Sequence, residues 1–461
     1  MASLTFLSEL GNSLSSDSRV IADHDSPEFA ASMERWSNYG LKIPSAIIQP
    51  ASEQDIVQAA QALLKASIPF VPASGGHSPF STIDQGGVVL ELNRYKGVEV
   101  DASNNRATVK GGTLMKELQV ALHPHRQFAA VGNMTTVGVI PYYIGGGISA
   151  YTPFVGHGAE NIISAKLVTA KGELVEVSET RNPELLWGVR GAGQFLGLVT
   201  EVTIKTSPYT LLGNDQGQRM CGTYIFPSQQ ADAVLAALRP IMESNEYVSA
   251  GHLLIAMAPP DFKHQALIAA PQVFCSAEEA TKLFQPLADL GPIMQTLEPS
   301  TFENHSDHLA YMCAKGDFKR FTQDGLIGWN AENFHQLIEL HAELVSNCPD
   351  AALTSYTLEW HTPSKAHREK DTSFGLEDIS YWLNLASWYK DANNHDLVDS
   401  ADKKAQAIMR RGTEEQDFIS YTNTSRADPI SYRYKGANRI ERLKALKEQW
   451  DPTGVFTKEF L

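Results

Sequence analysis

Apolar side chains follow two spacings along the first two hundred residues, and each spacing predicts one type of element. After the polar run at residues 52–55, apolar positions recur every three or four residues, which predicts a helix capped by Ser52. Residues 3–10 show the same spacing, and Thr113 is expected to cap a further helix ending near Leu122. Short apolar or alternating segments predict strands at 68–71, 87–92, 98–101, 107–110, 162–169, 174–177 and 198–204.

The pattern changes after Pro208, where long amphipathic segments replace the short elements. Helices are predicted at 228–242, 277–290, 331–346 and 394–411, and strands at 247–256, 356–361 and 379–388. This mixture predicts an α+β domain over residues 209–414. From about residue 415 the chain returns to a dense, motif-like composition.

Composition and charge narrow the class of protein. A chain of 461 residues with 43% hydrophobic and 20% charged residues is typical of a soluble protein with two or three domains. The formal charge of −15 would repel nucleic acids and anionic membranes, so we expect neither as a partner. No apolar run approaches the ~18 residues of a membrane span.

Cysteine and histidine spacing gives no sign of a metal site. The four cysteines are far apart, which favours free thiols in a reducing compartment. His123 and His125 have no acidic third ligand beside them, so we assign no metal. The N-terminus lacks the basic start of a signal peptide, and we expect a cytoplasmic protein.

The glycine-rich run Ser74-Gly75-Gly76-His77-Ser78 follows the strand predicted at 68–71. Two adjacent glycines allow close approach to a ligand and leave backbone amides open to phosphate oxygens. The histidine would stand beside whatever the loop binds. Taken alone, the run is more typical of a surface turn with a chance histidine.

A second glycine-rich stretch covers residues 132–138 and 144–149. So many small residues suit a chain that wraps closely around a flat or pyrophosphate-bearing ligand. A Rossmann turn is not indicated, because the G-x-G-x-x-G spacing, the preceding strand and the acidic residue that binds ribose are all missing.

Taken in order, these motifs resemble the FAD-binding half of the vanillyl-alcohol-oxidase (PCMH-type) flavoproteins. The matching segments are 74–78, 136–138, 145–147, 156–162 and 186–200. The tail resembles the berberine-bridge-enzyme-like branch at 421–423, 434–443 and 447–452. The resemblance implies an α+β fold with a two-subdomain FAD-binding domain over 1–208, completed by 415–461. The substrate domain, residues 209–414, would be an antiparallel sheet covered by helices.

The resemblance also implies the cofactor and its ligands. His77 occupies the position at which relatives bond covalently to the flavin 8α-methyl group, so we expect FAD attached through His77. Relatives with a second, cysteinyl link carry it where this chain has Met134, so we expect a single attachment. The residues assigned to FAD by this resemblance are Ser74, Gly75, Gly76, His77, Ser78, Met134, Thr136, Val137, Gly138, Tyr142, Gly145, Gly146, Gly147, Asn161, Ile162, Val199, Asn423 and Asn438.

Three positions differ from the family or tune its chemistry. The arginine common before the Gly-Gly-His run is Ala73 here, which removes a positive contact to the phosphates. Tyr142 either places a hydroxyl near the flavin pyrimidine or packs together with Tyr143. Val137 lies where relatives that react with oxygen tend to carry valine, which favours an oxidase with O2 as electron acceptor.

The catalytic assignment rests on two predicted strands and the tail. Glu359 and His361 project to one side of the strand at 356–361, and either could be the base that removes a substrate proton. Tyr421 would be a polar partner on a C-terminal Tyr-x-Asn strand, and Asn384 would share a face with Trp382. The alternative is that Glu359 is solvated and His361 lies at a sheet edge.

These expectations define an oxidase of specialised metabolism that transfers hydride from a small organic molecule to flavin N5, which either oxidises an alcohol or amine or closes a ring. Two alternatives stay open at this point. One is a non-redox, Diels–Alder-type cyclase in which FAD is structural. The other is a flavin-binding protein without turnover.

Overall fold

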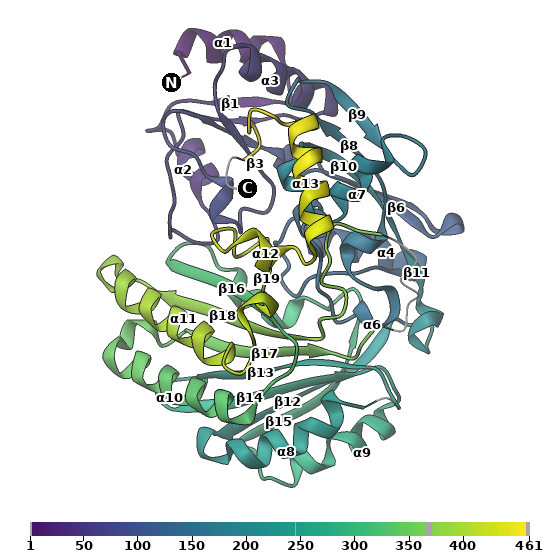
Figure 1. The fold of residues 1–461 in the computed structure, drawn as a ribbon, viewed down its shortest axis with the longest axis vertical. Coiled ribbons are helices and arrows are strands. Elements are labelled where there is room, and N and C mark those ends of the chain that lie inside the picture. The colour runs from purple at the N-terminus through teal and green to yellow at the C-terminus, as the bar shows by residue number, and fades with distance from the viewer. Residues whose placement is uncertain (1, 245, 365–370, 458–461) are drawn as a thin grey trace.

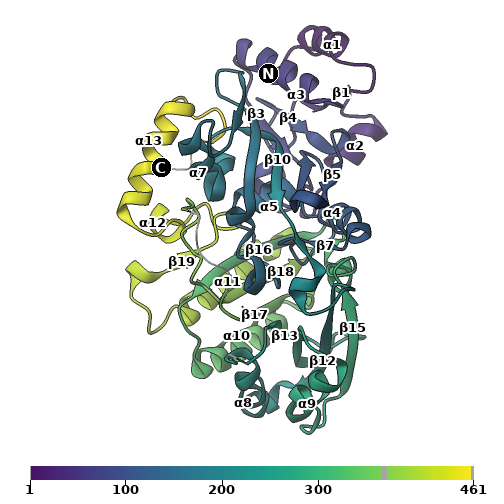
Figure 2. The same cartoon turned by 90° about the vertical axis from the view of Figure 1, so that its right-hand side faces the viewer.

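The structure, a computed structural model, describes residues 2–244, 246–364 and 371–457. Its elements form two groups stacked along the long axis, with the N-terminal elements at the top of Figure 1 and the longest sheet at the bottom. The C-terminal helix α13 (Ala437–Trp450) returns to the upper group and packs on α7 (Pro183–Ala192). Figure 2 shows the same arrangement from the side.

The first small sheet has the order β1-β2-β4-β3, with the last three strands parallel. Its strands are β1 (Arg19–Ile21), β2 (Ala46–Gln49), β3 (Phe70–Ala73) and β4 (Val88–Glu91). The accompanying helices are α1 (Leu4–Ser13), α2 (Pro27–Met33) and α3 (Glu53–Lys65). Ser52 caps α3 by accepting a hydrogen bond from Asp55 N, as the sequence predicted.

The second sheet is antiparallel with the order β5-β6-β10-β8-β9. Its strands are β5 (Val98–Asp101), β6 (Arg106–Lys110), β8 (Ile162–Val168), β9 (Leu174–Val177) and β10 (Leu198–Lys205). They lie at the predicted positions, and β5–β6 and β8–β9 pair as hairpins. Nearby are α4 (Met115–Leu122), α5 (Val139–Ile144), α6 (Thr152–Val155) and the short pair β7 (Gln127–Phe128) and β11 (Ser207–Pro208). The predicted cap of α4 is wrong. Thr113 instead bonds Gly97, and the helix begins one residue later, behind Leu114.

The third sheet has eight strands in the order β15-β12-β14-β13-β17-β18-β16-β19, and every neighbouring pair is antiparallel. The strands are β12 (Gln218–Pro227), β13 (Ser249–Met257), β14 (Gln265–Val273), β15 (Met294–Thr301), β16 (Phe318–Leu326), β17 (Ser355–His361), β18 (Tyr381–Tyr389) and β19 (Ile419–Ser420). The remaining helices are α8 (Ala231–Met242), α9 (Ala277–Ala288), α10 (Ala331–Asn347), α11 (His395–Met409) and α12 (Ile430–Arg433).

Helices α8 to α11 cover one face of the eight-stranded sheet, and their apolar sides share one buried core with it. The four helices lie within a few residues of their predicted positions. The predicted fold class, α+β with an antiparallel sheet covered by helices, is confirmed. None of the helices in the described part of the chain has the length and apolarity that crossing a membrane requires.

Candidate flavin site and active site

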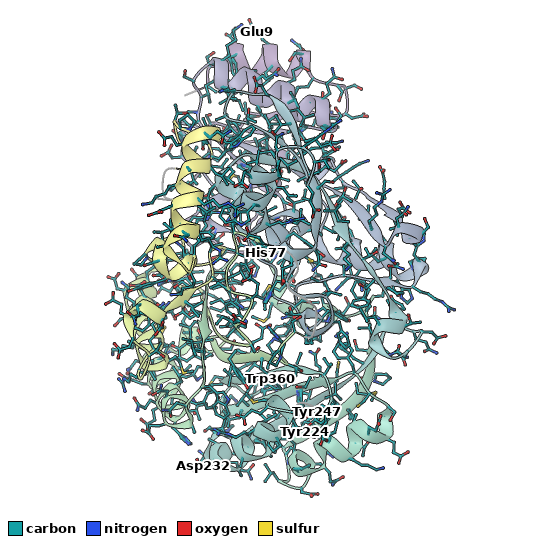
Figure 3. The ribbon with its side chains drawn as sticks, turned by 45° about the vertical axis from the view of Figure 1, so that its right-hand side comes forward. Glu9, His77, Tyr224, Asp232, Tyr247 and Trp360 are labelled. Atoms are coloured by element: carbon teal, nitrogen blue, oxygen red, sulfur yellow. The ribbon has the colours of Figure 1, made fainter. Side chains whose placement is uncertain are left out.

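The Gly-Gly-His run forms a loop after β3 that packs directly on the loop 134–138. A Cβ atom on Gly75 would lie 2.2 Å from the carbonyl oxygen of Thr136, so only glycine permits this approach. His77 Nε2 lies 2.7 Å from Thr136 Oγ1, although the two residues are 59 positions apart in the sequence. Figure 3 shows His77 near the middle of the molecule, between the two groups of elements. The structure therefore brings two of the predicted flavin motifs into contact.

The imidazole of His77 is also enclosed by Trp36. The two rings stack with their centroids 5.5 Å apart and their planes at 20°. Burial and, next, the positive charge of Lys319 lower the pKa of His77 to about 4. His77 is therefore neutral near neutral pH, and a neutral imidazole has the nitrogen lone pair that a bond to carbon requires.

Arg35 lies beneath the same loop and has unsatisfied donors. A Cβ atom on Gly76, whose φ is +69°, would lie 3.2 Å from Arg35 Cδ. Arg35 is 4% exposed; its Nη1 donates to the Ser32 carbonyl and lies 3.5 Å from Glu91 Oε1. Its Nε and Nη2 find no hydrogen-bond partner among the described residues. A buried cation with unused donors beside a glycine loop fits the pyrophosphate of FAD.

Replacing Arg35 with methionine is expected to weaken FAD binding by about 10- to 100-fold, the range for losing a hydrogen bond to a charged group. The measurement is a fluorescence titration with FAD, in a His77→Ala background so that binding stays reversible. Arg106→Met is the control, since Arg106 is half exposed on β6 and pairs with Asp101. Equal FAD affinity in the Arg35 and Arg106 variants would contradict this assignment.

The glycine triplet 145–147 packs against other segments of the protein. A Cβ atom on Gly145 would lie 2.0 Å from Asn423 Oδ1, and one on Gly146 would lie 2.3 Å from the ring of Phe374. The amide of Gly147 donates to Tyr421 Oη at 3.0 Å. The C-terminal segment therefore contacts the glycine triplet. Contact between the triplet and FAD stays a prediction.

Several side chains assigned to FAD already have partners within the protein. Ser74 Oγ and Tyr142 Oη each donate to a backbone carbonyl oxygen, at 3.0 and 2.7 Å, and Asn161 Nδ2 donates to two. The hydroxyl of Ser78 accepts from the amide of Phe80. Of the two alternatives for Tyr142, this geometry supports packing.

The other assigned residues lie in different surroundings. Ile162 and Val199 belong to the core beneath the second sheet. Met134 is half-buried within the loop that meets the Gly-Gly-His run. Asn438 is exposed in the first turn of α13, apart from the contacts described above.

A second group of predicted residues meets on the face of the large sheet that its helices leave uncovered. Along β17, Leu358 and Trp360 join the core under the helices, so Glu359 and His361 project to the opposite face. Both side chains are buried, with exposed fractions of 6% and 4%. The alternative that placed Glu359 in solvent and His361 at a sheet edge is therefore wrong.

The carboxylate of Glu359 is the centre of a polar cluster. Asn384 Nδ2 donates to Glu359 Oε2 at 2.6 Å, and Gln323 Nε2 lies 3.4 Å from the same oxygen. Asn133 Nδ2 donates to Glu359 Oε1 at 3.3 Å, and His252 Nε2 lies 3.6 Å from that oxygen. Because Asn133 belongs to the loop 132–138, the carboxylate lies beside a flavin motif.

Electrostatics keep Glu359 ionised and His361 neutral. Burial raises the pKa of Glu359, but the hydrogen bond and charge of His252, followed by the Asn384 amide, outweigh it, and the pKa lies below its ordinary value. Burial, and next the charge of His157, lower the pKa of His361 to about 4. At neutral pH Glu359 is thus the charged acceptor in this cluster.

Unpartnered buried atoms mark where a ligand would lie. His361 Nε2, Asn384 Oδ1, Trp382 Nε1 and His157 Nε2 are buried and have no hydrogen-bond partner among the described residues. The rings of His157 and His361 are 5.8 Å apart, and those of Trp382 and Tyr421 are 6.0 Å apart. Since buried polar groups normally find partners, this lining fits a bound flavin and substrate.

The predicted Tyr-x-Asn strand is wrong. Strand β19 ends at Ser420, and the amide of Thr424 donates to the carbonyl of Tyr421, which makes a turn. The polar residues of 422–428, followed by Pro429, favour turns over strands. The turn nevertheless directs Tyr421 Oη to the glycine triplet.

Sequence reasoning missed several residues of the site. His252 lies opposite Glu359 in the β13–β17 register, and Gln323 lies opposite Asn384 in the β16–β18 register. Strand alternation could have placed His252 on a face, but only the strand order pairs it with Glu359. For Arg35 and Trp36, no motif in the sequence marked them.

One premise about cysteine needs correction. The sequence places no cysteine near Met134, yet Cys313 Sγ lies 3.2 Å from Thr135 Oγ1, next to that position. The contact joins segments 178 residues apart, so sequence distance could not reveal it. All four cysteines are free.

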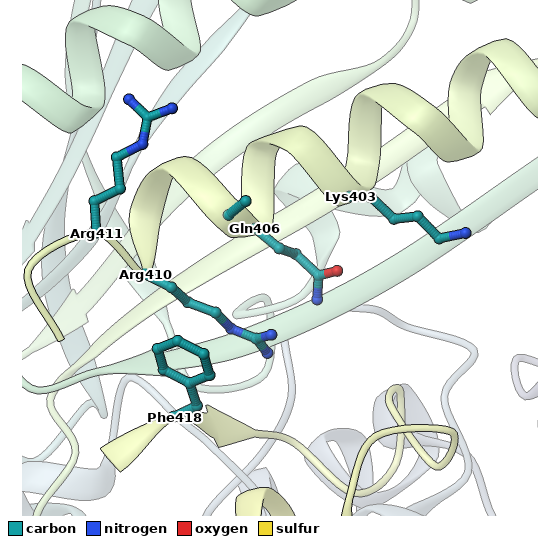
Figure 4. Close-up of a pocket in the computed structure, with 6 residues that line it drawn as sticks. Lys403, Gln406, Arg410, Arg411 and Phe418 are labelled. Atoms are coloured by element: carbon teal, nitrogen blue, oxygen red, sulfur yellow. The ribbon is translucent and has the colours of Figure 1, made fainter. Parts of the chain in front are cut away.

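A surface hollow lies elsewhere, between α11 and Phe418 (Figure 4). Its Arg410 Nη2 is 3.1 Å from Asp324 Oδ2 and 3.6 Å from Asp428 Oδ2, so neighbouring carboxylates already neutralise this cation. Within the described residues, His, Cys, Asp and Glu side chains form no group of three or more that could hold a metal ion.

Comparisons with known proteins agree with this geometry. Residues 44–178 match the family described as FAD binding domain. The chain is 29% identical to the FAD-linked oxidoreductase hasG of Aspergillus fumigatus, over 97% of each chain. Its fold is similar to BBE-like 1 of Physcomitrella patens, with TM-score 0.82 and 16% identity over 99% of this chain and 97% of that one. It also resembles glucooligosaccharide oxidase from Acremonium strictum, described with a 6-S-cysteinyl, 8α-N1-histidyl FAD, with TM-score 0.80 and 20% identity over 98% of each chain.

The loops around His77 and the sheet above them are thus those of a flavoprotein with a PCMH-type FAD-binding domain. More particularly, the chain is similar over nearly its whole length to FAD-linked oxidoreductases, and its fold is that of the berberine-bridge-enzyme-like proteins. The family resemblance drawn from its motifs is confirmed.

Proposed function

We propose that this protein is an oxidase that removes a hydride from a hydroxyl-bearing small organic molecule, with Glu359 as the base. The observation that supports it most is the contact between Glu359 and Asn133, which places an ionised carboxylate of the substrate sheet beside a flavin loop. When bound, FAD would supply hydride acceptance at N5 and return of the electrons to O2.

The residues around Glu359 have separable tasks in this proposal. Asn384 and Gln323 hold one carboxylate oxygen, which leaves the other directed to Asn133 and His252. Glu359 accepts the hydroxyl proton of the substrate as the hydride leaves its carbon. His252 Nε2, 3.6 Å from Glu359 Oε1, helps to hold the carboxylate in place.

His77 is proposed as the single covalent anchor of FAD. Thr136 holds its Nε2, which leaves Nδ1 for the bond to the 8α carbon. The 8α-histidyl bond described for glucooligosaccharide oxidase supports this assignment. A covalent bond of this kind raises the flavin potential and so favours hydride removal.

Three further proposals follow from the sequence. Val137 beside the flavin favours O2 as electron acceptor, and the composition favours a cytoplasmic protein. The division into an FAD-binding domain (1–208 with 415–461) and a substrate domain (209–414) is also proposed. Limited proteolysis at the two boundaries would test that division.

The experiment that tests the function mixes the purified protein with a panel of primary and secondary alcohols and amines without oxygen. Loss of the oxidised flavin spectrum, its return on admission of air and release of one H2O2 per turnover would support the oxidase. Conversion with the flavin oxidised throughout would point to a cyclase. A protein that shows no flavin spectrum at all would contradict the proposal.

A further inference from the structure

Lys319, at the start of β16, connects the substrate sheet to the surroundings of His77. Its ammonium group donates to the carbonyl oxygens of Trp36 at 2.8 Å, Ala314 at 2.6 Å and Gly316 at 2.8 Å. Lysine has three such donors, so all are used. The residue is 3% exposed, and an enclosed charge of this kind acts strongly on its neighbours.

Trp36 is held in place from the same direction. Its indole nitrogen donates to the carbonyl of Met312 at 2.7 Å. The ammonium of Lys319 lies 5.5 Å from the Trp36 ring and 4.4 Å from the Trp388 ring. Ser37 binds the backbone of Lys319 through two hydrogen bonds of 2.7 and 2.8 Å. Segment 36–37 is therefore fixed by the segment 312–319.

His77 is enclosed by this arrangement. Trp36 stacks on its ring, and Thr136 Oγ1 forms a hydrogen bond with its Nε2. The other ring nitrogen, Nδ1, is therefore left for another partner. The positive charge of Lys319 acts on the imidazole, and Arg35, packed under Gly76, is a second cation beside this loop, paired with Glu91 at 3.5 Å. Asp317, a carboxylate whose charge acts on Lys319, accepts a hydrogen bond from the indole nitrogen of Trp388.

We propose that Lys319 and Trp36 are positioning residues for the covalent attachment of FAD to His77, which completes only once the segment 312–319 has docked on residues 36–37. This inference rests on the proposed function, in which His77 is the anchor. Trp36 orients the imidazole, and Lys319 holds Trp36 and keeps the imidazole free of a proton.

The covalent attachment is a two-electron oxidation of the 8α methyl group. A bond forms between Nδ1 and the 8α carbon, and a C–H bond of that methyl group breaks. The methyl proton leaves to water, and the Nε2 proton of the imidazole follows once Nδ1 is alkylated. The electron pair remains in the flavin until O2 takes it up with two protons to form H2O2. Only the neutral imidazole has the lone pair for this bond, and a positive charge nearby disfavours its protonation.

The test follows attachment in apoprotein produced in riboflavin-starved cells, after addition of FAD in air, from about pH 3 to about pH 8, a range that includes the pKa of about 4 for His77. Covalent yield is measured by flavin fluorescence of the denatured band, and reversible FAD binding by fluorescence quenching. The variants are Lys319→Gln, which removes the charge, Lys319→Arg, which keeps it, and Trp36→Phe. Lys315→Gln is the matched control, because Lys315 belongs to the same segment but is exposed.

We expect all variants to bind FAD. With Lys319→Gln, attachment should be slower, and its pH midpoint should rise by about half a unit, a threefold change in the charged-to-neutral ratio. Lys319→Arg should keep the midpoint, Trp36→Phe should slow attachment at every pH, and Lys315→Gln should match the unmodified protein.

Unchanged rate and midpoint in Lys319→Gln would overturn the role of Lys319 and leave the anchor intact. If Lys319→Gln binds no FAD, the proposal is tested by comparing the attachment rates of Trp36→Phe and Lys315→Gln. Equal rates in these two variants would overturn the proposal. An unmodified protein that never becomes covalent would overturn the anchor itself, and the inference with it.

Discussion

Glu359→Gln is expected to slow flavin reduction by about 10²- to 10⁴-fold, the usual contribution of a general base. Glutamine keeps the size of the side chain and can still accept from Asn384, but it cannot take a proton. The effect should appear in the anaerobic reduction rate with a substrate identified from the alcohol panel. FAD content should stay unchanged, because Glu359 lies in the substrate sheet.

Two comparisons sharpen this result. Glu298→Gln, on the exposed edge strand β15, should behave as the unmodified protein. His361→Asn tests the other candidate base, and a loss of rate larger than that of Glu359→Gln would move the assignment to His361.

Because the pKa of Glu359 is lowered, the rate of flavin reduction should fall on the acid side only below the ordinary carboxylate range. A midpoint near neutral pH would contradict the carboxylate base.

His77→Ala is expected to convert bound flavin from covalent to releasable. The unmodified protein should stay yellow after acid precipitation, whereas the variant should lose its colour to the supernatant. The physical reason is that Thr136 and Trp36 leave one nitrogen of His77 for the bond. Intact-mass measurement should show the mass of one FAD on the unmodified chain and none on the variant.

Cys313 provides the control for single attachment. Its sulfur contacts Thr135, beside the position at which the sequence lacks a cysteine. Cys313→Ser should therefore leave the covalent flavin unchanged. Colour that persists in denatured His77→Ala but disappears in the double variant would show attachment through Cys313 and contradict the single anchor.

Local sequence signals predicted much of the fold. The Ser52 cap of α3 and the apolar spacing of α3, α8 and α10 identify those helices, since contacts within a few residues set them. The hairpins β5–β6 and β8–β9 follow from alternation around short turns. The cap predicted at Thr113 is wrong because the Thr113 hydroxyl bonds Gly97 in another segment. The strand predicted at 421–423 is wrong because the polar residues there favour a turn.

The site was less accessible to sequence reasoning. His77 and Glu359 stood out because their motifs or strand faces are local. His252 and Trp36 join the site through contacts between segments far apart in the sequence, and Lys319 through a contact across the two groups of elements. No local pattern records such contacts. Cys313 illustrates the same limit, because 178 residues separate it from the loop that it touches.

The measurement that tests the central claim most directly is the visible spectrum of the purified protein during a single anaerobic turnover, followed by admission of air. The account predicts that substrate bleaches the oxidised flavin, that Glu359→Gln prevents the bleaching, and that air restores the colour with one H2O2 per flavin. Product formation with an unchanged flavin spectrum and no H2O2 would contradict it.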